Sequence, residues 1–169
     1  KRRNRFGIDD SAYISNEPCE IDYSSFVGFF VRCDLVRSVW SLPNSELFIY
    51  GDDTLYTLGI KNRGYQLVFE PKIRFIHDCT TLAKQLRVYQ PLWKAYYTFR
   101  NGIIFYKRLS GKYFYPLMLP MLVVKFMSPL LKYAEPRVFI RLSIIAIVDG
   151  LREDLSRTHE EIMRISREK

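Results

Sequence analysis

The sequence predicts an α/β domain that is followed by a helical C-terminal appendage. The first half contains short runs of aromatic and β-branched residues, bounded by glycine, proline and turn residues, which is typical of strands. From about residue 80 onward, the apolar residues recur at helical spacing instead. We therefore expect an irregular arm over residues 1–21, an α/β part over residues 22–110 and a helical part over residues 111–169.

Composition and charge limit the classes of function. The chain has 169 residues, of which 48% are hydrophobic and 15% aromatic, enough for a folded domain with a core. Its formal net charge of +8 favours polyanionic partners: nucleic acid, an anionic membrane surface or a phosphate-bearing ligand. We expect no nucleic-acid partner, because the basic residues are dispersed and no nucleic-acid-binding motif is present.

The cysteines and the first residues of the chain bear on its compartment and completeness. Cys19, Cys33 and Cys79 are widely spaced and lack the spacing of a zinc site or of a disulfide framework. Reduced thiols predict a cytoplasmic protein. The chain opens on Lys1 without an initiator methionine, and we expect a fragment or a processed protein.

Turn residues and apolar runs divide the α/β part into short elements. A short helix is expected over residues 34–40. Asp52 or Asp53 should cap a second helix, which ends at Gly64, because Asp is a favoured N-cap and Gly a favoured C-cap. Extended segments are expected at residues 23–32, 47–50, 65–69 and 72–77.

The helical part begins before residue 110 and continues to the end of the chain. A long helical pattern starts near Thr80, and Pro91 should kink or split it. After Gly150, charged residues alternate with apolar residues at helical spacing, which predicts an exposed amphipathic helix. One apolar stripe of the long pattern consists of Leu92, Tyr96, Phe99 and Ile103.

The most apolar stretch, residues 113–131, approaches the length of a membrane-spanning helix. Three prolines and Lys125 argue against a span, and the apolar run at residues 138–148 is too short for one. Residues 113–148 therefore pack as core or lie in a membrane interface. In the second case, lipid phosphates would meet Lys112, Lys125, Lys132, Arg137 and Arg141.

Asp52 and Asp53 are the main candidates for chemistry. Adjacent carboxylates repel, so such a pair is expected to bind a cation or to retain one proton. At a helix start, one carboxylate can cap backbone N–H groups while the other acts as a general base toward a hydroxyl. His77, at the end of an extended segment, is a candidate metal ligand or proton carrier. In the structural alternative, Asp52 is a turn residue, Asp53 is an N-cap, and His77 is a histidine at a strand end with its hydrogen bonds satisfied.

Several motifs, in order, resemble the second half of a family 2 glycosyltransferase. The closest subgroup is the rhamnosyltransferase-like and galactofuranosyltransferase-like enzymes. The resemblance covers about residues 22–108, and the order and spacing of the motifs carry it. The motifs are residues 22–32, residues 46–58 around Tyr50-Gly-Asp-Asp53, Gly64-Tyr65, Glu70-Pro71, Ile76-His77 and Tyr96-Tyr-Thr-Phe-Arg-Asn101.

This resemblance implies a GT-A fold that binds a nucleotide-diphosphate sugar, and an inverting transfer to a hydroxyl of a cell-envelope or lipid-linked glycan. It implies Asp53 as the base, with Asp52 as its neighbour or an acceptor contact. His77 would help to hold Mg²⁺ or Mn²⁺ against the diphosphate. The substrate-binding residues would be Gly28, Gly51 and Trp40, although a tryptophan such as Trp40 more often belongs to a core than to a sugar site. Such enzymes often work at the cytoplasmic face, which implies peripheral contact with the inner face of the cell membrane.

The sequence departs from the family pattern at three places. The donor-binding half with its Asp-x-Asp motif is missing from the chain, so activity would need that part. Leu55 stands where many relatives carry an acidic residue, and Gly59 where they usually carry arginine. These departures keep open a second hypothesis, a catalytically degenerate glycan-binding or scaffold module. For Arg100 and Asn101 we expect a supporting role, in which they fix the loop that carries the acidic pair.

Overall fold

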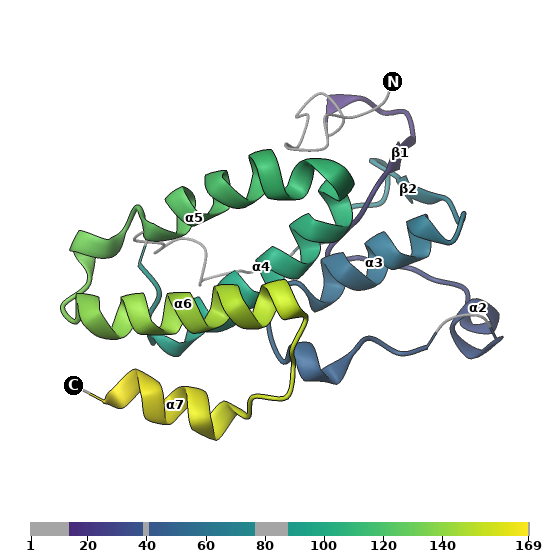
Figure 1. Ribbon diagram of the computed structural model, residues 1–169. Helices are drawn as coiled ribbons and strands as arrows, with labels where there is room; N and C mark the ends of the chain where they lie inside the picture. The colour runs from purple at the N-terminus through teal and green to yellow at the C-terminus, as the bar shows by residue number, and fades with distance from the viewer. Residues whose placement is uncertain (1–13, 39–40, 77–87, 169) are drawn as a thin grey trace. The chain divides into compact units, whose positions relative to one another are not determined.

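The computed structural model is mostly helical, with a small two-stranded antiparallel sheet (Figure 1). It describes residues 14–38, 41–76 and 88–168. The chain divides into two compact units. The first unit comprises Lys1–Asn44 and Asp53–Cys79, and the second, here called the helical unit, comprises Ser45–Asp52 and Thr80–Lys169.

The first unit has a small sheet and a small core. Strand β1 (Cys19–Ile21) pairs with strand β2 (Leu67–Phe69), with Glu20 opposite Val68. Helix α2 covers Cys33–Ser38, and helix α3 (Asp52–Asn62) supplies Ile60 to a core that is shared with Leu67. The buried Thr57 hydroxyl accepts the backbone N–H of Ser24 at 2.9 Å and thereby holds the segment after β1 against α3.

The predicted α/β class is confirmed only in part: the structure combines helices with a small sheet, but it is mostly helical because most of the predicted strands do not form in the described residues. Of the four predicted extended segments, as far as the structure describes them, only residues 65–69 contain a strand, β2. In residues 23–32, a turn closes with the N–H of Phe29 on the carbonyl of Phe26, around Gly28 at φ +68°. Residues 47–50 are not extended either, and residues 72–76 form no strand. A strand needs a neighbouring strand for its backbone groups, and aromatic or β-branched composition does not supply one.

The helical unit is built around α4 (Trp93–Ser110) and α6 (Pro136–Arg152), which pack on each other. The predicted stripe is confirmed, since Tyr96, Phe99 and Ile103 are buried on α4. Helix α4 begins two residues after Pro91, whereas the part of the predicted helix before residue 88 lies outside the described residues. The core of this unit consists of Ala95, Tyr96, Tyr97, Phe99, Ile103, Phe114, Met118, Leu122, Phe126, Val138, Phe139, Leu142, Ala146, Ile162 and Ile165.

The chain reverses direction between α4 and α5 (Leu119–Met127). The reversal passes through the 3₁₀ turn η2 (Gly111–Tyr113) and the π-helix η3 (Phe114–Met118). The two helices then lie side by side, because the rings of Phe99 and Phe126 stack with centroids 4.1 Å apart. A further 3₁₀ turn, η4 (Leu130–Lys132), leads toward α6.

An amphipathic helix does follow Gly150, as predicted, but it starts later than the predicted pattern, at His159. Helix α6 ends at Arg152, and Glu153 adopts a left-handed conformation at φ 54°. A separate helix, α7 (His159–Arg167), begins with a capping box between Thr158 and Glu161. Its apolar side is buried in the core and its charged side faces solvent, so only one face of the predicted amphipathic helix is exposed. The predicted ranges 1–21, 22–110 and 111–169 stay predictions.

One stretch of the described residues, Trp93–Lys132, is long and apolar enough to be a membrane span by length and composition. Its most apolar window has a mean hydropathy of 1.5, and only 28% of that window is buried. The stretch is not a single straight helix, since it contains the reversal between α4 and α5.

Gly150 allows the closest approach of α6 to α4. A Cβ at this position would lie 2.7 Å from the backbone oxygen of Arg100 and 2.8 Å from Cβ of Ile103. We predict that Gly150→Ala lowers the free energy of unfolding by about 1–3 kcal/mol, because the backbone of α4 has to move. Thermal denaturation measures this loss.

The matched control is Gly102→Ala on α4, where the new Cβ would meet only Cζ of Phe126, at 3.4 Å. There the gain in helix propensity, about 1 kcal/mol, should offset the contact and leave stability at or above that of the parent. Equal effects of the two substitutions would contradict the close approach at Gly150.

Candidate functional site

The acidic pair forms the first turn of α3. Asp52 and Asp53 are its first two residues, and Gly51 before them has φ +86°. The carboxylate of Asp53 accepts the backbone N–H of Thr54 at 2.7 Å. Negative charge at a helix start is stabilised by the N–H groups and the helix dipole. The prediction of a helix that starts at the pair and ends before Gly64, which has φ +88°, is confirmed.

The loop that leads into the pair has an unusual backbone. After the 3₁₀ turn η1 (Ser45–Leu47), Phe48 and Tyr50 adopt φ values of 66° and 63°. Left-handed backbone costs about 1–2 kcal/mol at a residue with a side chain. Such a loop persists only where surrounding contacts hold it.

Arg100 and Asn101 on α4 provide those contacts, and together they are called the Arg–Asn clamp here. The Nδ2 group of Asn101 donates to the carbonyl oxygens of residues 47, 49 and 50 at 3.0, 3.0 and 2.7 Å. Nη2 of Arg100 donates to the carbonyls of Glu46 and Leu47 at 3.0 and 3.2 Å. Nε of Arg100 donates to Oδ1 of Asn101 at 2.9 Å, which orients the amide. The prediction that these two residues fix the loop before the acidic pair is confirmed.

The clamp buries a positive charge. Arg100 is fully buried, and its guanidinium carbon lies 5.3 and 5.2 Å from the ring centroids of Tyr96 and Tyr97. Carbonyl dipoles and aromatic faces both attract a cation, which offsets part of the desolvation. Among the described residues, Nη1 of Arg100 has no hydrogen-bond partner. The guanidinium therefore serves mainly to organise the loop carbonyls.

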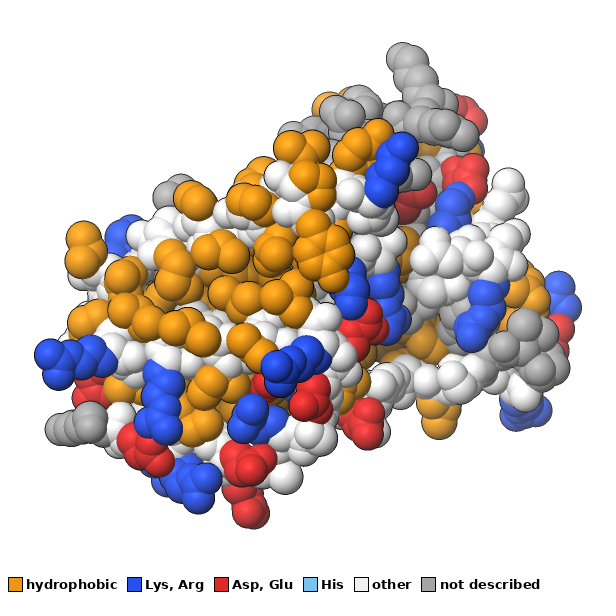
Figure 2. Space-filling view, viewed as in Figure 1, with side chains coloured by type: hydrophobic (Ala, Val, Ile, Leu, Met, Phe, Trp, Pro, Cys, Tyr) orange, Lys and Arg blue, Asp and Glu red, His pale blue; other side chains and the backbone are white. Residues whose placement is uncertain are grey.

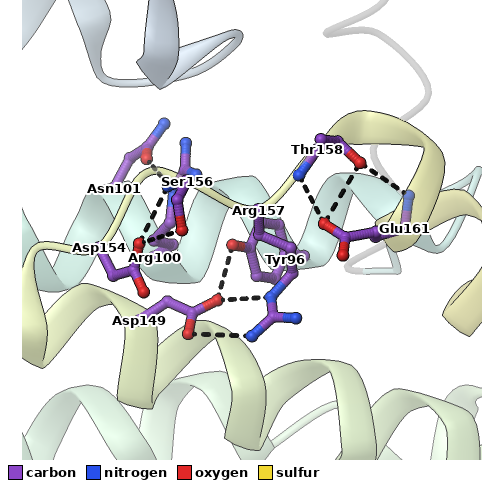
Figure 3. A network of polar contacts seen from close by, with 9 residues as sticks. All are labelled: Tyr96, Arg100, Asn101, Asp149, Asp154, Ser156, Arg157, Thr158 and Glu161. Carbon is purple, nitrogen blue, oxygen red and sulfur yellow. Dashed lines mark hydrogen bonds and ion pairs between the residues drawn. The ribbon is translucent and has the colours of Figure 1, made fainter.

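A second polar network holds the C-terminal segment to the same helix (Figure 3). The buried carboxylate of Asp149 on α6 accepts the hydroxyl of Tyr96 at 2.8 Å and Nε of Arg157 at 2.9 Å. Burial raises the pKa of the Tyr96 hydroxyl, and its hydrogen bond to Asp149 raises that pKa further. Tyr96 precedes the clamp by one turn, so this network and the clamp depend on the same stretch of α4.

Phe48 belongs to an aromatic cluster of the helical unit. Its ring stacks on His159 with centroids 4.7 Å apart and lies 4.9 Å from the ring of Tyr97. The hydroxyl of Tyr97 lies 3.1 Å from Nδ1 of His159. Trp93 packs edge-on against His159 at 4.9 Å. The left-handed turn at Phe48 thus places its ring on α4 and on the first residue of α7.

Asp149, Tyr97 and His159 were not among the predicted site residues. One signal was available for Asp149, the only acidic residue on the apolar stripe of α6 that includes Leu142 and Ala146. A carboxylate on a buried stripe indicates a buried partner. Tyr97 and His159 are partners of each other but lie 62 residues apart in the chain, so no local spacing indicates their contact.

The structure describes some of the other predicted site residues and not others. Gly28 lies in a turn of the first unit, and a Cβ there would come 2.8 Å from the ring of Phe75. A side chain at Gly28 would require the exposed ring of Phe75 to move, and the φ of +68° there also favours glycine. Leu55, in α3, is 6% exposed, as expected for an apolar residue in a packed helix. Trp40 and His77 lie outside the described residues, so their predicted roles stay predictions.

A metal site would need several donors at one place. Residues 14–38, 41–76 and 88–168 contain no group of three or more His, Cys, Asp and Glu side chains close enough to hold an ion. Carboxylate oxygens, as in Asp52 and Asp53, are the donors that Mg²⁺ and Mn²⁺ prefer. The acidic pair therefore fits part of such a site in donor type, and the remaining ligands stay a prediction.

No protein-family model, curated protein or solved structure matches the chain. The resemblance to family 2 glycosyltransferases consequently stands on the motifs alone.

Asn101→Leu tests the clamp. Leucine has a similar size but no donor, so the buried loop carbonyls lose hydrogen bonds that the amide supplied. We predict a loss of stability on the order of 2–3 kcal/mol. Amide hydrogen exchange should become faster in residues 48–54, as measured by mass spectrometry.

Asn62→Leu, at an exposed position at the end of α3, makes the same chemical change without the clamp. Its exchange in residues 48–54 should equal that of the parent protein. Unchanged exchange in Asn101→Leu would show that the loop holds its conformation without the amide.

The tyrosines of the helical unit predict a sensitivity to alkaline pH. Burial raises the pKa values of Tyr89, Tyr96, Tyr97 and Tyr133 above the ordinary value of 10.0. The unfolded chain then loses these protons at lower pH than the folded chain, so stability is full below pH 10 and falls as the pH rises above it. Urea denaturation across this range should show the fall. Tyr96→Phe should make it shallower, with Tyr115→Phe at an exposed side chain as the matched control.

Proposed function

We propose that this chain is the C-terminal portion of a GT-A catalytic domain with a helical appendage. The enzyme would be an inverting glycosyltransferase that moves a sugar from a nucleotide-diphosphate donor to a hydroxyl of a cell-envelope or lipid-linked glycan. One observation supports it beyond the motifs. The motif blocks at residues 46–58 and 96–101 are joined through the Arg–Asn clamp, which holds the loop directly before the acidic pair. Two motifs far apart in sequence thus serve one local structure.

In this proposal, Asp53 is the general base. Its ionised carboxylate takes the proton of the acceptor hydroxyl while that oxygen attacks the anomeric carbon of the donor sugar. The bond from the anomeric carbon to the diphosphate breaks, the diphosphate leaves with its electron pair, and the configuration inverts. The hydrogen bond from the N–H of Thr54 orients the carboxylate. General-base catalysis of this kind contributes about 10²–10⁴-fold in rate.

Asp52 and the loop have supporting roles in the same proposal. Asp52, the neighbour of the base in the first turn of α3, would contact the acceptor. The clamp holds the loop up to the carbonyl of Tyr50, directly before Gly51, in one conformation. A divalent Mg²⁺ or Mn²⁺ ion would supply charge compensation for the leaving diphosphate when bound. His77 is its proposed ligand from this chain, and the donor-binding half would supply the rest.

A catalytically degenerate glycan-binding or scaffold module is the second candidate. The buried Leu55 favours it, because an apolar residue stands in the second turn of α3 where many relatives carry an acidic side chain. In that case the clamp stabilises the fold and Asp52 and Asp53 serve only as helix-start residues.

The deciding assay is glycosyl transfer by the complete gene product, with a panel of nucleotide sugars, Mg²⁺ or Mn²⁺, and a lipid-linked acceptor. We predict that Asp53→Asn lowers kcat by at least about 100-fold, because the amide cannot accept the proton. Asp154→Asn removes a carboxylate from an exposed turn and should leave kcat near that of the parent.

The outcomes separate the two candidates. Transfer that survives in Asp53→Asn removes this residue from the role of base. Absence of transfer with every donor, combined with binding of the acceptor glycan, favours the degenerate module.

A further inference from the structure

The helical unit exposes an apolar surface along η3, α5 and α6. In Figure 2, hydrophobic side chains form a broad band over α5 and α6. Several of its residues are more than half exposed, with Leu131 at 94% and Val124 at 70%. This surface is called the α5–α6 apolar face here. It comprises Tyr113, Tyr115, Leu117, Met121, Val124, Leu131, Ile140, Ile144 and Val148.

The apolar face is additional to the core of the unit. Phe114, Met118, Leu122 and Phe126 of the same segment point inward and are buried. The segment is therefore apolar on both sides, although one buried side is enough to fold it. Exposed apolar patches of this extent in a soluble protein mark an interaction surface.

Charge around the face indicates the kind of partner. Residues 111–148 contain five basic residues and one acidic residue, Glu135. In the part of the chain that the structure describes, no carboxylate lies within ion-pair distance of Lys125, Lys132 or Arg137. The acidic residues of the unit are concentrated beyond residue 148, in the end of α6 and around α7. The partner of the apolar face should therefore be apolar and anionic.

A shallow hollow on α6 combines both properties. It is lined by Arg137, Ile140, Arg141, Ile144 and Ile145, so two guanidinium groups flank three aliphatic side chains. Arg141 also pairs with Glu168 at the end of the chain. Guanidinium groups recognise phosphate, and the isoleucines suit acyl chains or the glycerol region.

The face suits the surface of a bilayer better than its interior. Helix α5 has nine residues and is about 14 Å long, whereas the hydrocarbon core of a bilayer is about 30 Å thick. Its inner side packs on α4 through the stacked Phe99 and Phe126. An amphipathic segment of this kind lies in the plane of the interface, with its apolar side at the boundary between headgroups and acyl chains.

We propose that the α5–α6 apolar face docks on an anionic lipid bilayer, with η3 and α5 at the acyl boundary and the flanking lysines and arginines on lipid phosphates. The inference does not depend on the proposed transferase activity, since it uses only exposure, charge and length. If both hold, docking would keep the acidic pair near lipid-linked acceptors on the cytoplasmic face.

The test is flotation of the full chain with vesicles of phosphatidylcholine, alone or mixed with phosphatidylglycerol. We expect stronger binding to the anionic vesicles. Leu117→Glu combined with Val124→Glu should lower the partition coefficient on the order of tenfold or more. Lys132→Ser combined with Arg137→Ser should lower binding to anionic vesicles by about fivefold per residue and leave binding to phosphatidylcholine unchanged.

Matched controls carry the same changes elsewhere. Leu42→Glu alters an exposed leucine of the first unit, and Lys72→Ser with Arg74→Ser removes two exposed charges there. Both should bind vesicles like the parent. Circular dichroism of each variant confirms that it is folded.

Three outcomes would overturn the proposal. The first is equal flotation of the patch variants and their controls. The second is a stable dimer in solution that Val124→Glu dissociates, which assigns the face to a second copy. The third is resistance to alkaline carbonate extraction, which indicates a spanning segment. The proposal is supported if the chain binds the mixed vesicles and if both salt and the patch substitutions abolish this binding.

Discussion

The hydrogen bonds from Arg100 and Asn101 to the carbonyls of residues 46–50 are the constraint on which the candidate site depends. The loop has left-handed backbone at Phe48 and Tyr50, which is unfavourable without outside support. A guanidinium and an amide buried on α4 supply that support. The loop ends at Gly51 and Asp52, so the clamp acts on the segment that directly precedes the acidic pair in the chain.

The clamp in turn requires that α4 be held in place along its length. Gly150 allows α6 to approach the backbone of α4 at Arg100, and Asp149 binds Tyr96 one turn earlier. Arg157 joins the same carboxylate and ties the segment before α7 to the network. A buried polar network of this kind rigidifies the unit only while every member is present. The helical appendage is therefore part of what positions the loop.

Local patterns predicted the helices well and the strands poorly, and the difference has a physical cause. A helix satisfies its own backbone groups, so the Asp52 start, the Gly64 end and the stripe of Tyr96, Phe99 and Ile103 could be read from spacing. A strand depends on a partner elsewhere in the chain. Residues 23–32 have strand-like composition, yet they turn at Gly28, whose φ of +68° glycine adopts without a steric penalty. For the site, the roles of the acidic pair came from motifs, whereas Asp149, Tyr97 and His159 became visible only through contacts across more than 50 residues.

The sequence by itself determined the helical elements, the acidic pair at a helix start and the excess of basic and apolar residues over residues 111–148. These properties depend on neighbours within a few positions in the chain. Only the tertiary structure decided which apolar side chains of η3 and α5 form core and which face outward, because both sides of the segment are equally hydrophobic. It also decided that Arg100 and Asn101 bind backbone carbonyls, since those carbonyls come from a loop about 50 residues away. Packing between distant segments selects among the conformations that local sequence permits.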